Sequence, residues 1–314
     1  MELDIQYLLL LQELRNITGG VFDELFNSIS KIAVDVMPFL PFLIFGAVDK
    51  KWGYRFLYAH SVSEVLNGVI KLTVCAYRPW IRSNQIEPAG DAKTAATGYS
   101  FPSGHTMSCT STYGSVFAWQ RERRKWLAIL CVVAIFLTGF SRNFLGVHTP
   151  QDVVVGFLAG AFTVYIVGIL FQKFSGNNDL LDRLTIFGLI IVILIIVYIT
   201  FKSYPMDYVD GVLLVDPQKM MNDCFKGCGE FTGLLLGNYL ERHYIEYEIP
   251  YGSSSLPTFT CVGIGILFSW KNYLAPATIV AAFGGHWGNF ITRCIMMIFA
   301  VYIWPKVIMK SVRA

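Results

Sequence analysis

The sequence predicts an all-α protein, a polytopic membrane bundle of about nine transmembrane helices with an N-terminal interfacial helix. Two features of the composition indicate this class. Of the 314 residues, 54% are hydrophobic and 15% are charged, whereas a soluble domain carries about 25% charged residues. The apolar residues also gather into runs close to the roughly 20 residues that a helix needs to cross a bilayer. The net charge of +3 is too small to indicate nucleic acid as a partner.

The N-terminal stretch predicts a helix that lies on the membrane surface. Leucines recur at helical spacing from Leu3 to Leu14, but acidic residues interrupt the run, which is too short to span a bilayer. Such an amphipathic stretch is typical of an interfacial helix. Residues 1–16 lack the basic start and the small-residue cleavage site of a signal peptide, so we expect no cleaved leader.

Nine apolar segments then follow, and each is a candidate membrane span. Pro38 and Pro41 are expected to kink the first. The second is unusually polar, and Pro276 interrupts the eighth. The seventh is weak, and we expect it to extend further on one side. The expected spans are residues 32–48, 52–77, 104–120, 126–140, 153–171, 184–201, 229–240, 258–283 and 287–304.

The charged loops predict the orientation of these spans. The loops around Lys50 and from Arg121 to Lys125 are basic, and the positive-inside rule places both in the cytoplasm. The loop from Phe201 to Glu230 holds five acidic residues against three lysines, and it falls on the outer face. This topology gathers polar residues from separate stretches at the outer face, namely Lys71, Arg78, His105, Arg142 and His148.

Three short stretches carry the residues suited to chemistry. Lys71 and Arg78 lie seven residues apart, about two helical turns, so both cations share one helix face. Pro102-Ser-Gly-His105 precedes an apolar run, and the free N–H groups at the start of a helix form a ready anion site. The third stretch, Ser141 to Asp152, holds an arginine, a histidine and a carboxylate four residues after that histidine.

These residue types suit a phosphate group. Lys71, Arg78 and Arg142 supply three cations, and a guanidinium donates two aligned hydrogen bonds to phosphate oxygens. Ser103 and the N–H of Gly104 add neutral donors at the helix start. Several cations gathered at one depth are costly in a membrane protein unless they serve a function.

The three stretches resemble the tripartite pattern of the type 2 phosphatidate phosphatase superfamily, which also includes glucose-6-phosphatases and vanadium-dependent haloperoxidases. The pattern reads Lys-x6-Arg-Pro, Pro-Ser-Gly-His and Ser-Arg-x5-His-x3-Asp. Every fixed position is filled between Lys71 and Asp152. With the helices that hold the motifs, the resemblance covers about residues 50–172, and it says less about the rest of the chain.

The resemblance implies a role for each reactive side chain. His148 is the nucleophile, which forms a phosphohistidine, and Asp152 orients its ring and stabilises its charge. His105 is the general acid that protonates the leaving alcohol, and it then acts as the base on the attacking water. The resemblance implies no metal site and no cofactor.

The resemblance implies a metal-independent membrane phosphatase that hydrolyses a lipid phosphate or a polyprenyl diphosphate at the outer face. We expect residues 1–30 to form the interfacial segment, residues 31–178 the catalytic core, and residues 179–314 additional transmembrane helices. A sugar-phosphate phosphatase similar to glucose-6-phosphatase stays open. A transporter or channel with a polar pore is the alternative from another class, although the sequence shows no convincing inverted repeat.

Other polar residues have weaker signals. Cys224 and Cys228 lie four apart, so they form a disulfide if an oxidising space surrounds them, or they lie unbridged on one helix face; the sequence leaves both open. His60, Glu64 and Asn67 share one face of the second span. We expect them to pack internally or to support Lys71.

Overall fold

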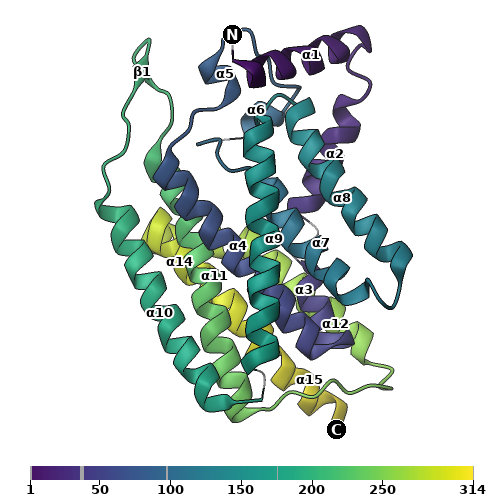
Figure 1. Ribbon diagram of the computed structural model, residues 1–314. Helices are drawn as coiled ribbons and strands as arrows, with labels where there is room; N and C mark the ends of the chain where they lie inside the picture. Colours follow the sequence, from purple (N-terminus) through teal and green to yellow (C-terminus); the bar gives the residue numbers. More distant parts are fainter. Residues whose placement is uncertain (1, 36–38, 97, 175, 314) are drawn as a thin grey trace. The chain divides into compact units, whose positions relative to one another are not determined.

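The computed structural model describes residues 2–35, 39–96, 98–174 and 176–313 (Figure 1). The protein is mostly helical, as predicted, and its strands are the short antiparallel pair β1 (Tyr208–Val209) and β2 (Val212–Leu213). The chain divides into two compact units. The first unit comprises Met1–Pro38, Leu66–Val164 and Lys202–Met220, and the second comprises Phe39–Val65, Tyr165–Phe201 and Met221–Ala314.

Helices α4, α9 and α11 contribute residues to both units. These three helices are α4 (Lys50–Val74), α9 (Pro150–Phe174) and α11 (Pro217–Tyr244). The other helices of the first unit are α1 (Leu3–Ile17), α2 (Asp23–Asp35), α5 (Pro79–Arg82), α6 (Ala92–Ala95), α7 (Gly104–Gln120) and α8 (Lys125–Phe144). Those of the second unit are α3 (Leu40–Leu43), α10 (Asn178–Phe201), α12 (Leu256–Ser269), α13 (Ala281–Phe283), α14 (Gly285–Ile298) and α15 (Trp304–Arg313), with π-helical segments η2 (Ile44–Val48), η3 (Trp270–Leu274), η4 (Pro276–Val280) and η5 (Phe299–Ile303).

Four helical segments of the described chain are long and apolar enough to cross a membrane. They are Lys125–Phe144, Pro150–Phe174, Asn178–Phe201 and Gly285–Ser311. The total of about nine spans and the interfacial position of α1 therefore stay predictions. The expected first span includes residues 36–38, so a kink at Pro38 lies outside the described residues.

The helix of the expected seventh span extends mainly on its N-terminal side, so the loop expected before it is too long. The sequence predicts a loop from Phe201 to Glu230, but α11 already begins at Pro217. The carboxylate of Asp216 accepts a hydrogen bond from the N–H of Gln218 (2.9 Å), and proline is favoured at the first helical position. Polar side chains in the first turns hide this helix from a search for apolar runs.

In the first unit, glycines allow α9 to lie directly against α7. A Cβ atom at Gly156 would come within 2.8 Å of the carbonyl oxygen of Ser103, and one at Gly160 within 2.8 Å of that of Met107. Small residues four apart permit such close helix contact. The N–H of Ser103 also donates to the carbonyl oxygen of Asp152 (2.9 Å). The start of α7 is therefore held against the start of α9.

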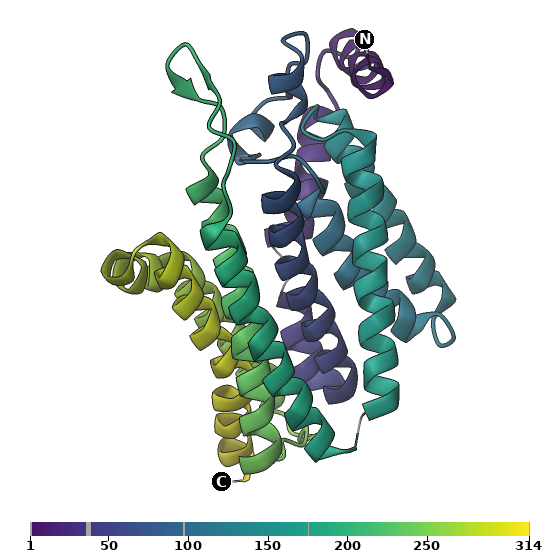
Figure 2. The same cartoon turned by 60° about the vertical axis from the view of Figure 1, so that its left-hand side comes forward.

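In the second unit, a second row of glycines packs α11 against α14. A Cβ atom at Gly229 would come within 2.2 Å of the carbonyl oxygen of Phe290, and one at Gly233 within 2.3 Å of that of Cys294. Figure 2 shows α11 in green alongside the yellow C-terminal helices. Cys224 and Cys228 lie buried on α11, and both are free thiols.

Candidate active site

The first unit brings together all three stretches that the sequence singled out. The end of α4 carries Lys71, the start of α7 follows Ser103, and the turn between α8 and α9 carries His148. Of the eight predicted residues, six are buried and two, Gly104 and His105, are partly exposed.

The imidazole of His148 has a different partner at each ring nitrogen. The guanidinium of Arg78 lies 2.8 Å from Nε2, and because arginine can only donate, Nε2 accepts and carries no proton. Nδ1 therefore carries the hydrogen. It lies 3.4 Å from the carboxylate Oδ2 of Asp152 and 3.4 Å from the hydroxyl of Ser100. This tautomer leaves Nε2 as the nitrogen with a free lone pair apart from its contact with Arg78.

Two further donors hold the carboxylate of Asp152. The Ser100 hydroxyl donates to Oδ2 (2.6 Å), and the N–H of Thr149 donates to the same oxygen (2.8 Å). Asp152 also lies in the first turn of α9, where the helix dipole favours negative charge. Asp152 is thus fixed before any substrate binds.

The backbone around His148 is fixed as well. The side-chain amide of Asn143 donates to the carbonyl oxygen of His148 (2.9 Å), and Arg78 donates to that of Val147 (2.9 Å). Neither Asn143 nor Ser100 is among the residues predicted from the sequence. Ser100 lies between Tyr99 and Phe101 and has no spacing signature of its own, so only the folded chain reveals its contact with Asp152.

Burial and nearby charges set the protonation of His148 and Arg78. Burial lowers the pKa of His148 well below its ordinary value, and the nearby Arg78 lowers it further, while Asp152 acts in the opposite direction. Burial lowers the pKa of Arg78 to about 10. At neutral pH, therefore, the imidazole is neutral and the guanidinium keeps its charge.

The other two cations lie close to the same residues. The ammonium of Lys71 donates to the carbonyl oxygens of Tyr99 (2.8 Å) and Ser100 (3.2 Å). Arg142 donates to the hydroxyl of Ser30, but its buried Nε has no hydrogen-bond partner among the described residues. An orphaned buried donor is rare and costly, and an anion would supply its acceptor.

The start of α7 supplies the neutral part of the site. The Ser103 side chain accepts from the hydroxyl of Thr106 (2.9 Å) and caps the helix, while the first N–H groups of a helix have no partner within it. Next along α7, His105 lies within electrostatic range of Arg142 and His148. The amide oxygen of Asn67 lies 3.2 Å from where a Cβ atom of Gly104 would be.

A cavity of about 720 Å³ adjoins Asp152, one of the predicted catalytic residues. Asp152 and Thr149 line it, together with Tyr77, Arg82 and Phe101. The cavity is large enough for the head of a sizeable ligand. In the described part of the chain, no group of three His, Cys, Asp or Glu side chains is placed to hold a metal ion.

The comparisons with known proteins concern this same region. Residues 52–176 match the model of the PAP2 superfamily. The chain is 28% identical over 130 residues to an undecaprenyl-diphosphatase of Sulfolobus acidocaldarius, covering 41% of this chain and 60% of the relative. It is 29% identical over 126 residues to phosphatidylglycerophosphatase B of Bacillus subtilis, covering 38% and 58%.

A third relative is more similar over a shorter stretch. Phosphatidylglycerophosphatase B of Escherichia coli is 40% identical over 82 residues, covering 26% of this chain and 32% of the relative. The chain thus spans 60% or less of the length of these curated relatives. No solved structure gives a significant match.

Proposed function

We propose that this chain is a membrane phosphatase acting on a lipid phosphate or a polyprenyl diphosphate, on the premise that residues 52–176 match the model of the PAP2 superfamily. One observation carries the proposal. The Nε2 lone pair of a neutral, buried His148 is backed by Asp152 at Nδ1 and lies beside the guanidinium of Arg78. The names of the relatives, an undecaprenyl-diphosphatase and two phosphatidylglycerophosphatases, support a lipid substrate.

The first chemical step forms a covalent intermediate. Nε2 of His148 attacks phosphorus, a P–N bond forms, and the P–O bond to the leaving group breaks. Protonated His105 donates its proton to the departing oxygen. In the folded protein the guanidinium of Arg78 donates to Nε2 of His148 (2.8 Å). The substrate phosphate must therefore bind this guanidinium through its own oxygens before Nε2 can attack.

The second step releases phosphate. His105, now neutral, takes a proton from water as the water oxygen attacks phosphorus, and the P–N bond breaks. Asp152 stabilises the positive imidazole through Nδ1–H in both steps. Arg78, Arg142 and Lys71 balance the charge of the phosphoryl group, so the proposed reaction uses no metal ion.

Phosphate release from purified protein tests this proposal. We expect wild-type enzyme to hydrolyse phosphatidylglycerol phosphate or a polyprenyl diphosphate in detergent, with or without a chelator, and to leave a hexose phosphate unreacted. His148→Ala should lose activity by at least about 10⁴-fold, because the nucleophile is absent. Unchanged thermal melting of the variant serves as the control for folding.

Three results would count against parts of the proposal. Full activity of His148→Ala would overturn the covalent mechanism. Loss of activity with a chelator that magnesium restores would overturn the metal-independent step. Preferential hydrolysis of the hexose phosphate would replace the lipid substrate with a sugar phosphate.

A further inference from the structure

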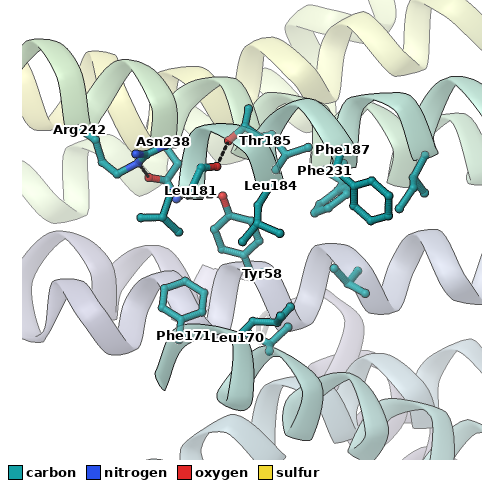
Figure 3. A pocket seen from close by; sticks show the side chains of 15 residues that line it. Tyr58, Leu170, Phe171, Leu181, Leu184, Thr185, Phe187, Phe231, Asn238 and Arg242 are labelled. Carbon is teal, nitrogen blue, oxygen red and sulfur yellow. Dashed lines mark hydrogen bonds between the residues drawn. The ribbon is translucent and has the colours of Figure 1, made fainter. Parts of the chain in front are cut away.

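The arginines inside this protein differ in how completely they are bonded. In the second unit, Arg242 lies at the edge of an apolar cavity, and its Nε donates to Asn238 (3.0 Å), as Figure 3 shows. The other two nitrogens of this guanidinium donate to Asn178 (3.3 Å) and to the carboxylate of Asp182 (2.8 Å). Arg242 is therefore held by the protein itself, and a carboxylate balances its charge.

Arg142 in the first unit is bonded far less completely. It is 3% exposed, and the charged group that acts on it is a second cation, Arg78. Among the described residues, its one hydrogen-bond partner is the neutral hydroxyl of Ser30, and its Nε has no acceptor. A buried charge without a counter-ion is costly, so the fold leaves Arg142 to be completed by an anion.

Helix α2, which carries Ser30, lies before the part of the chain that matches the family model. It packs against α7 and α8 (Figure 1). The ring centroid of Phe26 on α2 lies 5.4 Å from that of Phe140 and 4.5 Å from that of Phe144, both on α8. Ser30 follows Phe26 by four residues, about one helical turn, so both side chains lie on the same face of α2. The aromatic contacts thus fix the buried Ser30 beside Arg142.

We propose that Ser30 is a positioning residue for the phosphatase reaction, which holds Arg142 in the orientation that grips the phosphate. Its hydroxyl accepts from Nη1, so the opposite edge of the guanidinium, formed by Nε and Nη2, stays free. That edge can donate two parallel hydrogen bonds to phosphate oxygens. The inference rests on the proposed function, because the anion that completes Arg142 is taken to be the phosphate of the substrate.

A serine suits this role because it is neutral. The hydroxyl oxygen accepts a hydrogen bond without removing the positive charge of Arg142. A carboxylate at position 30 would pair with the guanidinium, as Asp182 pairs with Arg242, and would compete with the phosphate. Ser30 therefore orients Arg142 and leaves its charge for the substrate.

Kinetics and direct binding on the purified full-length protein test this role. The substrate is phosphatidylglycerol phosphate, and the binding probe is inorganic phosphate, measured by isothermal titration calorimetry. Ser30→Ala should raise KM and the Kd for phosphate about tenfold, since a hydrogen bond to a charged group is worth about that factor. The change in kcat should be smaller, because Arg142 holds the phosphate in the ground state as well as in the transition state. Ser30→Thr keeps a hydroxyl and should restore most of the affinity.

A double variant shows whether Ser30 acts through Arg142. In the Arg142→Lys background, Ser30→Ala should have little further effect on the Kd for phosphate, because lysine lacks the two-pronged edge. Ser28→Ala is the matched control, since Ser28 is exposed on the same helix. It should keep the KM and the Kd of the wild type, and thermal melting confirms that each variant folds.

The inference is overturned if Ser30→Ala keeps the KM and the Kd of the wild type. It is also overturned if Ser30→Ala weakens phosphate binding equally in the wild-type and Arg142→Lys backgrounds, which would indicate a general loosening of α2. A wild-type protein that binds phosphate but does not hydrolyse the lipid would count against the proposed function, while the Kd values would still decide the role of Ser30. A wild-type protein that does neither would overturn both.

Discussion

An imidazole nitrogen can attack phosphorus only when the ring is neutral. For the single residue His148, burial keeps the ring in this neutral form. Because its pKa is lowered in the folded protein, the unfolded chain takes up a proton at a higher pH than the folded chain does. The sign follows: folding is favoured above the ordinary histidine pKa of about 6.5, and this stability is lost as the pH falls below it.

We therefore expect the thermal midpoint of the wild-type protein to decrease as the pH is lowered from about 7.5 to about 5, and to decrease less in His148→Gln. Each unit by which the pKa is lowered removes up to about 1.4 kcal/mol at acidic pH. Differential scanning fluorimetry across this range measures the effect. Parallel curves for the two proteins would show that His148 does not contribute to the acid sensitivity.

Ser100 gives the second prediction at this scale, as a positioning residue. Ser100→Ala removes the 2.6 Å hydrogen bond to Asp152 but leaves the bond from the Thr149 N–H. Loss of such an outer partner typically costs about 10–100-fold in activity, so we expect that decrease in kcat with little change in KM. Ser100→Thr keeps a hydroxyl and should retain more activity; equal kcat for wild type and Ser100→Ala would refute the role.

The motif positions could be predicted from the sequence because fixed spacings reveal them, and the structure places those residues in one unit. The contacts of Ser100 and Asn143 could not be predicted, because they depend on how the α8–α9 turn folds against the loop before α7. The orphaned Nε of Arg142 is likewise a property of packing, which no spacing reveals.

At the scale of the elements, the contact between α7 and α9 aligns the site. Gly156→Ala would place a methyl group 2.8 Å from the carbonyl oxygen of Ser103. Helices α7 and α9 must then separate, and Ser103, the N-cap residue of α7, moves away from Asp152. Overpacking typically costs about 1–3 kcal/mol. We expect a lower thermal midpoint and a lower kcat.

Gly168→Ala is the matched control on the same helix, because a Cβ atom there meets nothing within 4 Å. Replacing a helical glycine in open space removes a penalty of about 1 kcal/mol relative to alanine. This variant should be as stable as the wild type or more so. If both variants melt and react alike, the close approach of α9 to α7 is not what aligns the site.

The helices show which features of the fold a sequence reveals. The expected span at residues 104–120 coincides with α7, Gly104–Gln120, because Ser103 is a strong capping residue and the basic turn ends the apolar run. The loop expected from Phe201 to Glu230 ends too late, because the first turns of α11 are polar and contain no apolar run. A search for the Asp216-Pro217 capping signal would have found its start.

At the scale of the whole molecule, the orientation in the membrane is the open prediction, and α7 links it to the site. This helix has 17 residues, a length of about 26 Å at about 1.5 Å per residue. Ser103 and Gly104, which we propose to bind phosphate, lie at its start, and the basic turn from Arg121 follows its end. If α7 crosses the bilayer, that turn and the site lie on opposite sides.

The positive-inside rule places the basic turn in the cytoplasm, so the site and the β1–β2 hairpin are expected outside. Two single cysteines test this, Arg123→Cys in the turn and Val212→Cys in the hairpin, since both positions are exposed. Cys261 is the exposed native cysteine of the described residues, so it is first replaced by alanine.

In intact cells, a membrane-impermeant maleimide should label Val212→Cys at once. It should label Arg123→Cys only after the membrane is permeabilised, because the basic turn faces the cytoplasm. The Cys261→Ala parent gives the background signal. The reverse pattern would place the phosphate site in the cytoplasm, and its substrate would then have to come from the inner leaflet.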